Sequence, residues 1–131
     1  MTETNLLYTL ALQHVHNIGD ITAKRLISNC GSAENIFKEK KQNLLKIDGI
    51  GGVSLNELTK PHHLKEAEKE LEFIKSNAIK VSYFQEKDYP EKLKHCIDGP
   101  VLLYQTCEIN LKKKHIISIV GARKITTNGI A

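Results

Sequence analysis

Residues 121–129, GARKITTNG, combine groups that suit the binding of an anion. Glycine lets the main chain approach a ligand closely, and arginine offers a planar fork of donors to phosphate oxygens. Threonine hydroxyls can donate to phosphate or cap the helix that is expected to follow, whose N-terminus adds a partial positive charge. We therefore expect a phosphate-binding turn made by Gly121, Ala122, Arg123, Lys124, Thr126, Thr127 and Gly129.

The element that must position this turn is a predicted strand. Ile116, Ile117, Ile119 and Val120 form an apolar run that Gly121 ends. Such runs suit strands covered on both faces, as in a parallel sheet. The turn has neither the G-x-G-x-x-G of dinucleotide sites nor the P-loop pattern, so we expect a Rossmann-like fold without NAD, ATP or another cofactor. An ordinary turn with an exposed arginine remains an alternative.

Two further strands are predicted ahead of this one. Residues 79–84 alternate between apolar and polar, which is typical of a half-buried strand. Residues 100–105, PVLLYQ, form a second continuous apolar run that suits a parallel sheet. Residues 88–94 between them predict a single helical turn.

Residues 5–77 have a helical period instead. Gly31 is expected to end one helix, and Ser32 to cap a short one that reaches Phe37. Pro61 is expected to open the longest helix. The apolar stripe of that helix is Leu64, Ala67, Leu71 and Ile74. We place the boundary between a helical domain and the start of an α/β domain near residue 78.

Two segments of the helical half, 15–27 and 45–58, resemble each other and are similar to the helix-hairpin-helix motif. That motif has Gly-apolar-Gly between two short helices. The second segment contains Gly49-Ile50-Gly51, whereas Asn17 stands at the first glycine position of the other. Asparagine tolerates positive φ better than most residues, so we expect both turns to form.

Such turns can hold a DNA phosphate at a helix N-terminus without reading a base. Lys24 and Arg25 favour this role for the first turn, and Asp20 weakens it. The alternative is a helical scaffold or protein-docking module. The candidate contacts are Gly19, Thr22, Lys24, Gly49, Gly51, Gly52 and Ser54.

Composition excludes few classes of protein. The chain has 131 residues and a net charge of +4, which permits a polyanionic partner without requiring one. No apolar run approaches the roughly 20 residues that span a membrane, and we expect neither membrane binding nor a signal peptide.

Cysteines and histidines predict no special chemistry. Cys30, Cys96 and Cys107 lack the spacing of a disulfide framework or zinc site, which favours a cytoplasmic location. No set of histidines, the His62–His63 pair included, has metal-ligand spacing. We expect the histidines at the surface or at helix caps, and no metal.

The order and spacing of several motifs are more specific than any one of them. They are Tyr89-Pro90, Leu93, Asp98-Gly99-Pro100-Val101-Leu102-Leu103-Tyr104, Val120-Gly121-Ala122-Arg123, Thr126-Thr127 and Gly129. This arrangement resembles the DNA-processing protein A family, DprA, also called Smf. The resemblance extends from about Leu6 to the last residue and is most specific over residues 80–129.

The resemblance implies a bacterial cytoplasmic protein that binds single-stranded DNA and loads the RecA recombinase onto it, in natural transformation and related recombination. It implies an α+β chain, with an all-α helix-hairpin-helix, SAM-like domain at 1–78 and the first strands of an extended Rossmann-like domain at 79–131. The intact family member would dimerise. Arg123 would be the main DNA contact, and Asn128 stands where family members often carry an aromatic residue.

One strand and one turn cannot complete a parallel sheet, so we expect the chain to be the front part of a longer, truncated protein. No set of paired carboxylates near a histidine supports hydrolysis, and we expect no enzymatic activity. One alternative is a nucleotide-phosphate-binding enzyme that resembles nucleoside monophosphate phosphoribohydrolases. The other is the helical protein-docking module.

Overall fold

The computed structural model describes residues 1–112, 115 and 117–130, and combines helices with a small sheet, which confirms the α+β prediction. Within these residues, no helix has the length and apolar character that crossing a membrane requires. The elements are α1 (Glu3–His14), α2 (Asp20–Cys30), α3 (Ala33–Lys38), α4 (Lys41–Leu44), α5 (Gly52–Leu58), α6 (His62–Ser76), β1 (Lys80–Tyr83), α7 (Glu91–Lys94), β2 (Leu102–Gln105) and α8 (Thr127–Ile130).

The predicted helix boundaries are confirmed. Gly31 ends α2 with a φ of +88°, a conformation that side chains disfavour. The Ser32 hydroxyl accepts a hydrogen bond from the Asn35 N–H at 3.2 Å and so caps α3. Pro61 immediately precedes α6. Each helix therefore begins or ends at a residue whose chemistry suits that position.

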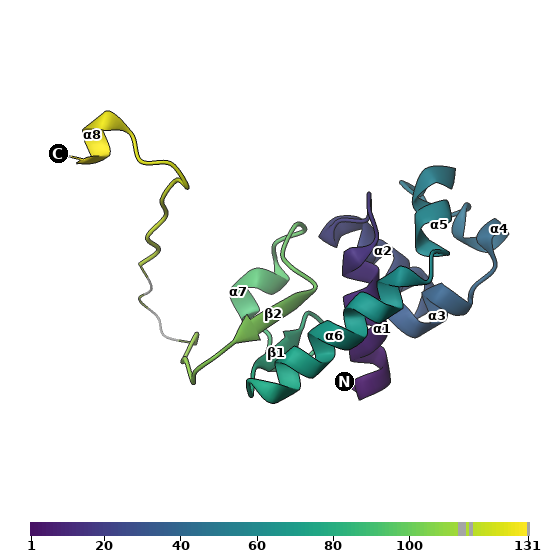
Figure 1. The fold of residues 1–131 in the computed structure, drawn as a ribbon, viewed down its shortest axis with the longest axis horizontal. Helices are drawn as coiled ribbons and strands as arrows, with labels where there is room; N and C mark the ends of the chain where they lie inside the picture. Colours follow the sequence, from purple (N-terminus) through teal and green to yellow (C-terminus); the bar gives the residue numbers. More distant parts are fainter. Residues whose placement is uncertain (113–114, 116, 131) are drawn as a thin grey trace.

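Helix α6 packs against α1, and the two helices cross in Figure 1. Ala67, Leu71 and Ile74 are buried as predicted, and Leu64 is half-buried. The expectation for the histidines is wrong at His63, which is fully buried because it lies on the same stripe. Its Nε2 lies 2.8 Å from the carbonyl oxygen of Glu57, and burial lowers the pKa of its ring.

Strands β1 and β2 lie within the predicted strands, and α7 lies within the predicted helical turn. The two strands pair antiparallel, with Lys80 opposite Gln105 and Tyr83 opposite Leu102. The parallel sheet that the apolar run at 100–105 predicts does not appear in the pairing that the structure describes. Leu102 and Tyr104 lie on the same face of β2, where Leu102 is buried and Tyr104 is 45% exposed, so the cover on this face decreases along the strand.

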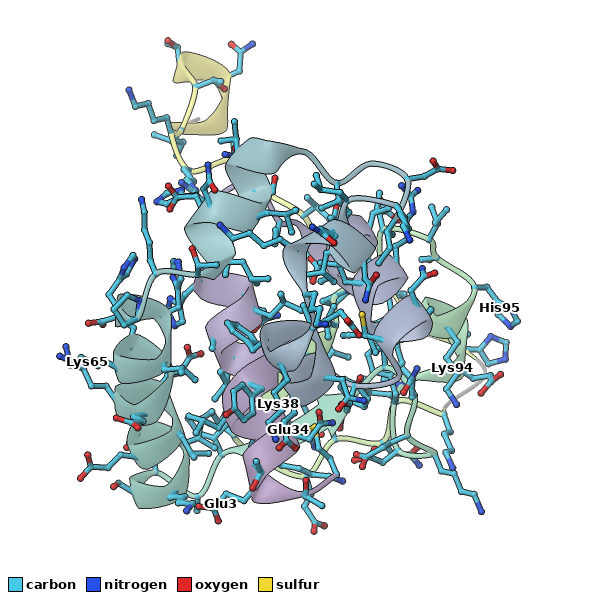
Figure 2. All side chains as sticks on the ribbon, turned by 90° about the vertical axis from the view of Figure 1, so that its right-hand side faces the viewer. Glu3, Glu34, Lys38, Lys65, Lys94 and His95 are labelled. Carbon is cyan, nitrogen blue, oxygen red and sulfur yellow. The ribbon has the colours of Figure 1, made fainter. Side chains whose placement is uncertain are left out.

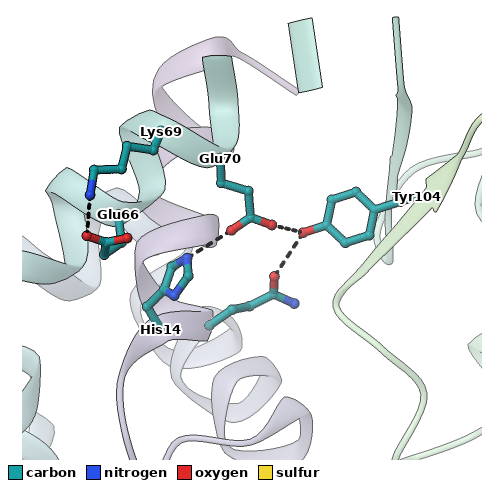
Figure 3. Close-up of polar contacts among 6 residues, drawn as sticks. His14, Glu66, Lys69, Glu70 and Tyr104 are labelled. Carbon is teal, nitrogen blue, oxygen red and sulfur yellow. Dashed lines mark hydrogen bonds and ion pairs between the residues drawn. The ribbon is translucent and has the colours of Figure 1, made fainter. Parts of the chain in front are cut away.

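Hydrogen bonds attach the sheet to the helices. The Tyr104 hydroxyl of β2 lies 3.0 Å from Oε1 of Glu70 in α6 and 3.3 Å from Oε1 of Gln13 in α1 (Figure 3). The other Glu70 oxygen lies 2.8 Å from Nε2 of His14. Burial, together with the Glu70 carboxylate, raises the pKa of Tyr104, so this hydroxyl keeps its proton.

A single hydrophobic core extends from the helices into the sheet. It contains Leu10, Leu26 and Ile27 of the helices together with Val101 and Leu102. The two strands thus cover apolar side chains of the helical half, in place of the further strands that a parallel sheet would supply.

The predicted buried strand at 115–120 is wrong for the residues that the structure describes there. Residues 115 and 117–120 form no strand, and Ile117, Ile119 and Val120 are 91%, 96% and 91% exposed. Ile116, which the prediction included, lies outside the described residues. No described strand pairs with this segment, so its apolar side chains have no neighbour to pack against. The segment leads away from the helices towards α8 (Figure 1).

Candidate nucleic-acid interface

The two turns between helices follow the same backbone path. Asn17 has a φ of +66° and Gly49, at the equivalent position, a φ of +85°. The isoleucine that follows each of them is buried, at 6% exposure for Ile18 and 8% for Ile50. This confirms the expectation that asparagine can replace the first glycine.

The second glycine of each turn is the residue before a helix. Gly19 precedes α2 and Gly51 precedes α5, both in an extended conformation and neither with a side chain to cap the helix. An added Cβ at either position would meet nothing within 4 Å. The backbone in front of both helices is therefore open to close approach by another molecule.

The other predicted contacts of the two turns occupy equivalent positions in α2 and α5. Thr22 and Ser54 are both the third residue of their helix, and both are half-buried. Gly52 is the first residue of α5, where α2 has Asp20. Each turn thus combines an open glycine with a hydroxyl one helical turn away, which suits a phosphate group.

Asp20 gives the first turn an internal partner. Its Oδ1 accepts a hydrogen bond of 2.9 Å from the N–H of Val101, a residue with no exposed surface. The carboxylate also places a negative charge in the first turn of α2, where it stabilises the helix and competes with an outside anion. The first turn is thereby engaged with the residue before β2.

Arg25 connects α2 with the second turn. Its Nη1 donates a hydrogen bond of 2.7 Å to the carbonyl oxygen of Asp48. The guanidinium fits closely against the second turn, because a Cβ added at Gly49 would lie 2.5 Å from Nη1. Arg25 therefore holds the second turn against α2, a position that the sequence pattern does not reveal.

Lys24 does not point towards either turn. Its Nζ lies 5.6 Å from the centre of the Phe84 ring, over the aromatic face. The attraction between a cation and an aromatic ring favours this position. Lys24 thus faces the segment that follows β1 rather than the glycines with which it was grouped.

The third predicted group, at residues 121–129, lies apart from both turns (Figure 1). Thr126 caps α8 as predicted, since its Oγ1 accepts a hydrogen bond of 3.3 Å from the N–H of Gly129. Every predicted contact of this group is exposed: Gly121, Ala122, Arg123, Lys124, Thr126, Thr127 and Gly129. The group is therefore accessible to a polyanion, but the structure does not bring it together with the hairpins.

The residues of the middle motif have structural roles. The Tyr89 hydroxyl donates a hydrogen bond of 2.7 Å to the carbonyl oxygen of Pro100. Gly99 is buried beneath it, and a Cβ there would lie 3.0 Å from the Leu93 carbonyl oxygen. The spacing of Tyr89, Leu93 and Gly99 is thus explained by close packing around the entry to β2. Among residues 1–112, 115 and 117–130, no cluster of potential metal ligands occurs.

Residues 80–131 match the family model of DNA recombination-mediator protein A. The predicted resemblance to DprA is confirmed over this segment. The match includes β1, α7, β2 and the exposed group at 121–129, and it connects the chain with DNA recombination. No solved structure matches the chain.

Sequence reasoning missed two residues that lie near the predicted contacts. The sequence predicts a strand at Phe84 and a helical turn at Lys94, but no binding role for either residue. Both line a groove beside α2 together with Lys24. The sequence gives only a weak signal of this groove. Lys24 and Phe84 belong to different elements, and a contact between distant elements leaves no local sequence pattern.

Proposed function

We propose that the protein is a non-enzymatic recombination mediator that binds single-stranded DNA and helps to load RecA recombinase onto it. The observation that carries this proposal is the DprA-family match over residues 80–131, which contains the Gly-Ala-Arg sequence. The exposure of Arg123 and the open glycines of the two turns support it. The proposal includes a cytoplasmic location and a dimer in the intact family member.

Phosphate contacts would supply most of the affinity. Arg123 and Lys124 are exposed side by side and carry two of the positive charges that a DNA backbone attracts. Arg123 presents a planar fork that can donate two parallel hydrogen bonds to one phosphate. Binding of this kind depends on salt and reads little of the base sequence.

We assign the helical segment 1–78 a supporting role as a helix-hairpin-helix domain. Its second turn is the better candidate for a phosphate, because the first turn of α5 carries no acidic residue. The first turn of α2 carries Asp20, which is already bound to Val101. Residues 79–131 would be the start of the Rossmann-like domain that carries Arg123.

The decisive experiment is fluorescence anisotropy of labelled oligo-dT, and of a duplex, with the full 131-residue chain at several salt concentrations. We expect tighter binding to the single strand, and weaker binding for Arg123→Ala, with Arg123→Lys retaining part of the affinity. The logarithm of affinity should fall with that of salt at about −0.7 per phosphate neutralised. Absence of binding at low salt would refute the proposal for this chain.

The second turn can be tested without disturbing the fold. Gly51 has a φ of −102° and open space around its Cα, so other residues fit there. Gly51→Asp adds a negative charge at the start of α5, and Gly51→Asn is its neutral match. Weaker DNA binding by the aspartate variant alone would support a phosphate at this turn. Stimulation of RecA filament formation on the same oligonucleotide would then test the loading step.

A further inference from the structure

A groove of about 480 Å³ lies between α2 and the segment 84–97. From α2, the side chains that line it are spaced by three and four residues and so share one helical face. The opposite wall comes from the end of β1 and from the residues around α7. The side chains relevant to binding are Ile21, Lys24, Arg25, Phe84, Lys94 and Ile97.

The charge of this groove has one sign. Lys24, Arg25 and Lys94 line it, and no carboxylate is among the described residues of its wall. The Nζ of Lys94 lies 3.5 Å from Oε2 of Glu91. Water strongly screens the attraction between these two surface charges. Figure 2 shows Lys94 beside His95 at the edge of the molecule, where both can meet a partner from solvent. The groove is therefore complementary to an anion.

The floor of the groove is apolar. The Phe84 ring is half-buried, while Ile21 is 41% exposed and Ile97 76% exposed. Single exposed isoleucines are common on protein surfaces and need no explanation. Here they flank an aromatic ring within reach of lysine side chains. An aromatic floor with cations around it is the arrangement on which proteins stack the bases of single-stranded nucleic acids.

We propose that this groove binds one nucleotide unit of a single-stranded nucleic acid, a site additional to Arg123. The base packs on Phe84 and the two isoleucines and takes the place of the Lys24 ammonium over the ring. Lys24 then contacts one flanking phosphate and Lys94 the other. This inference rests on the proposed function, because it assumes that the chain meets single strands. An acidic peptide would use the same cations but would gain little from the aromatic floor.

The test compares labelled oligo-dT of about 12 nucleotides, a size within the usual range for one binding site, with an abasic phosphodiester of equal length. Both carry the same charge, so their difference in affinity reports on base stacking alone. We expect the full chain to bind oligo-dT about tenfold more tightly, which is the usual worth of one stacked base. Poly-glutamate of equal charge should compete poorly.

Two kinds of variant locate the effect. Phe84→Leu and Ile97→Ser should each reduce the preference for oligo-dT over the abasic strand, and the exposed Ile97 serves as the variant least able to affect folding. The double variant Lys24→Gln, Lys94→Gln should weaken the binding of both ligands. It should also reduce the magnitude of the salt slope by about 1.4, which corresponds to two phosphate contacts. Lys65→Gln is the matched control, since Lys65 lies on α6 at the opposite edge of Figure 2.

The outcomes separate this site from the proposed function. If Arg123→Ala weakens oligo-dT binding and all groove variants bind like the unmodified chain, the groove is not a nucleotide site and the proposed function stands. Equal affinity for oligo-dT and the abasic strand, or effective competition by poly-glutamate, would also overturn the groove assignment. If the unmodified chain binds no oligonucleotide at all, both proposals fail.

Discussion

The turn between α1 and α2 and the turn between α4 and α5 have the same backbone but different attachments. In the first, Asp20 binds Val101 and joins the helix start to the residue before β2. In the second, the first turn of α5 carries no acidic residue, and the Arg25 guanidinium of α2 holds the turn in place. The same backbone geometry therefore attaches the start of α2 to the sheet, whereas it leaves the start of α5 open.

The largest expected effect is in the second turn. Gly49→Ala forces a side chain into a φ of +85° and displaces Arg25 from the Asp48 carbonyl. The left-handed backbone costs about 1–2 kcal/mol, and the lost hydrogen bond adds about 0.5–1.5 kcal/mol. We expect the free energy of unfolding in urea to fall by about 2 kcal/mol.

Gly51→Ala is the matched control, because Gly51 has a negative φ and open space. It should cost only about 0.5 kcal/mol, the difference between glycine and alanine before a helix. Equal losses for the two variants would show that the positive φ and the Arg25 contact do not distinguish these glycines.

A smaller effect is expected in the first turn. Asp20→Ala leaves the buried Val101 N–H without its acceptor and removes a favourable charge from the start of α2. The cost should be about 1.5 kcal/mol in urea denaturation. Asp20→Asn keeps an acceptor oxygen and should lose less. If the asparagine variant is as unstable as the alanine variant, charge rather than the hydrogen bond attaches this turn.

The smallest effect concerns pH and the contact between α6 and the end of α5. His63 of α6 holds the Glu57 carbonyl at the end of α5, and burial lowers the pKa of its ring, with the neighbouring His62 acting in the same direction and Glu57 against it. The unfolded chain, with an ordinary histidine pKa near 6.5, therefore binds the proton more readily. Stability is fully present above about pH 6.5 and should decline as pH falls through the lower folded pKa.

The measurement is urea denaturation between about pH 7.5 and 5, with His63→Leu as the comparison. The leucine variant should lose less stability on acidification than the unmodified chain. Parallel pH profiles for the two proteins would assign the acid sensitivity to groups other than His63.

Local chemistry made much of the fold predictable. Gly31 and Ser32 specify helix ends by their own conformational preferences, and Asn17 could be recognised as a substitute for glycine because both tolerate positive φ. These signals depend on a few neighbouring residues. They also predicted both glycine turns, which contain half of the predicted DNA contacts.

Contacts between distant segments could not be predicted in the same way. The run PVLLYQ indicated a strand, but not that it would pair antiparallel with β1. Arg25 and Asp20 bind backbone groups of other segments, and a bond from a side chain to the main chain leaves no periodic trace in the sequence. For the same reason Lys24 was grouped with the turn, although its side chain faces Phe84.

The bond between Asp20 and Val101 joins residues 81 positions apart. Because a ribosome delivers a chain from its amino terminus, Asp20 emerges long before its partner has been synthesised. Once α6 has been synthesised, α1 to α6 still lack the strands that cover part of their apolar core, and such exposed apolar surface is prone to aggregation. The hydrophobic core of the helices can therefore be completed only after the segment with Val101 and Leu102 has been synthesised.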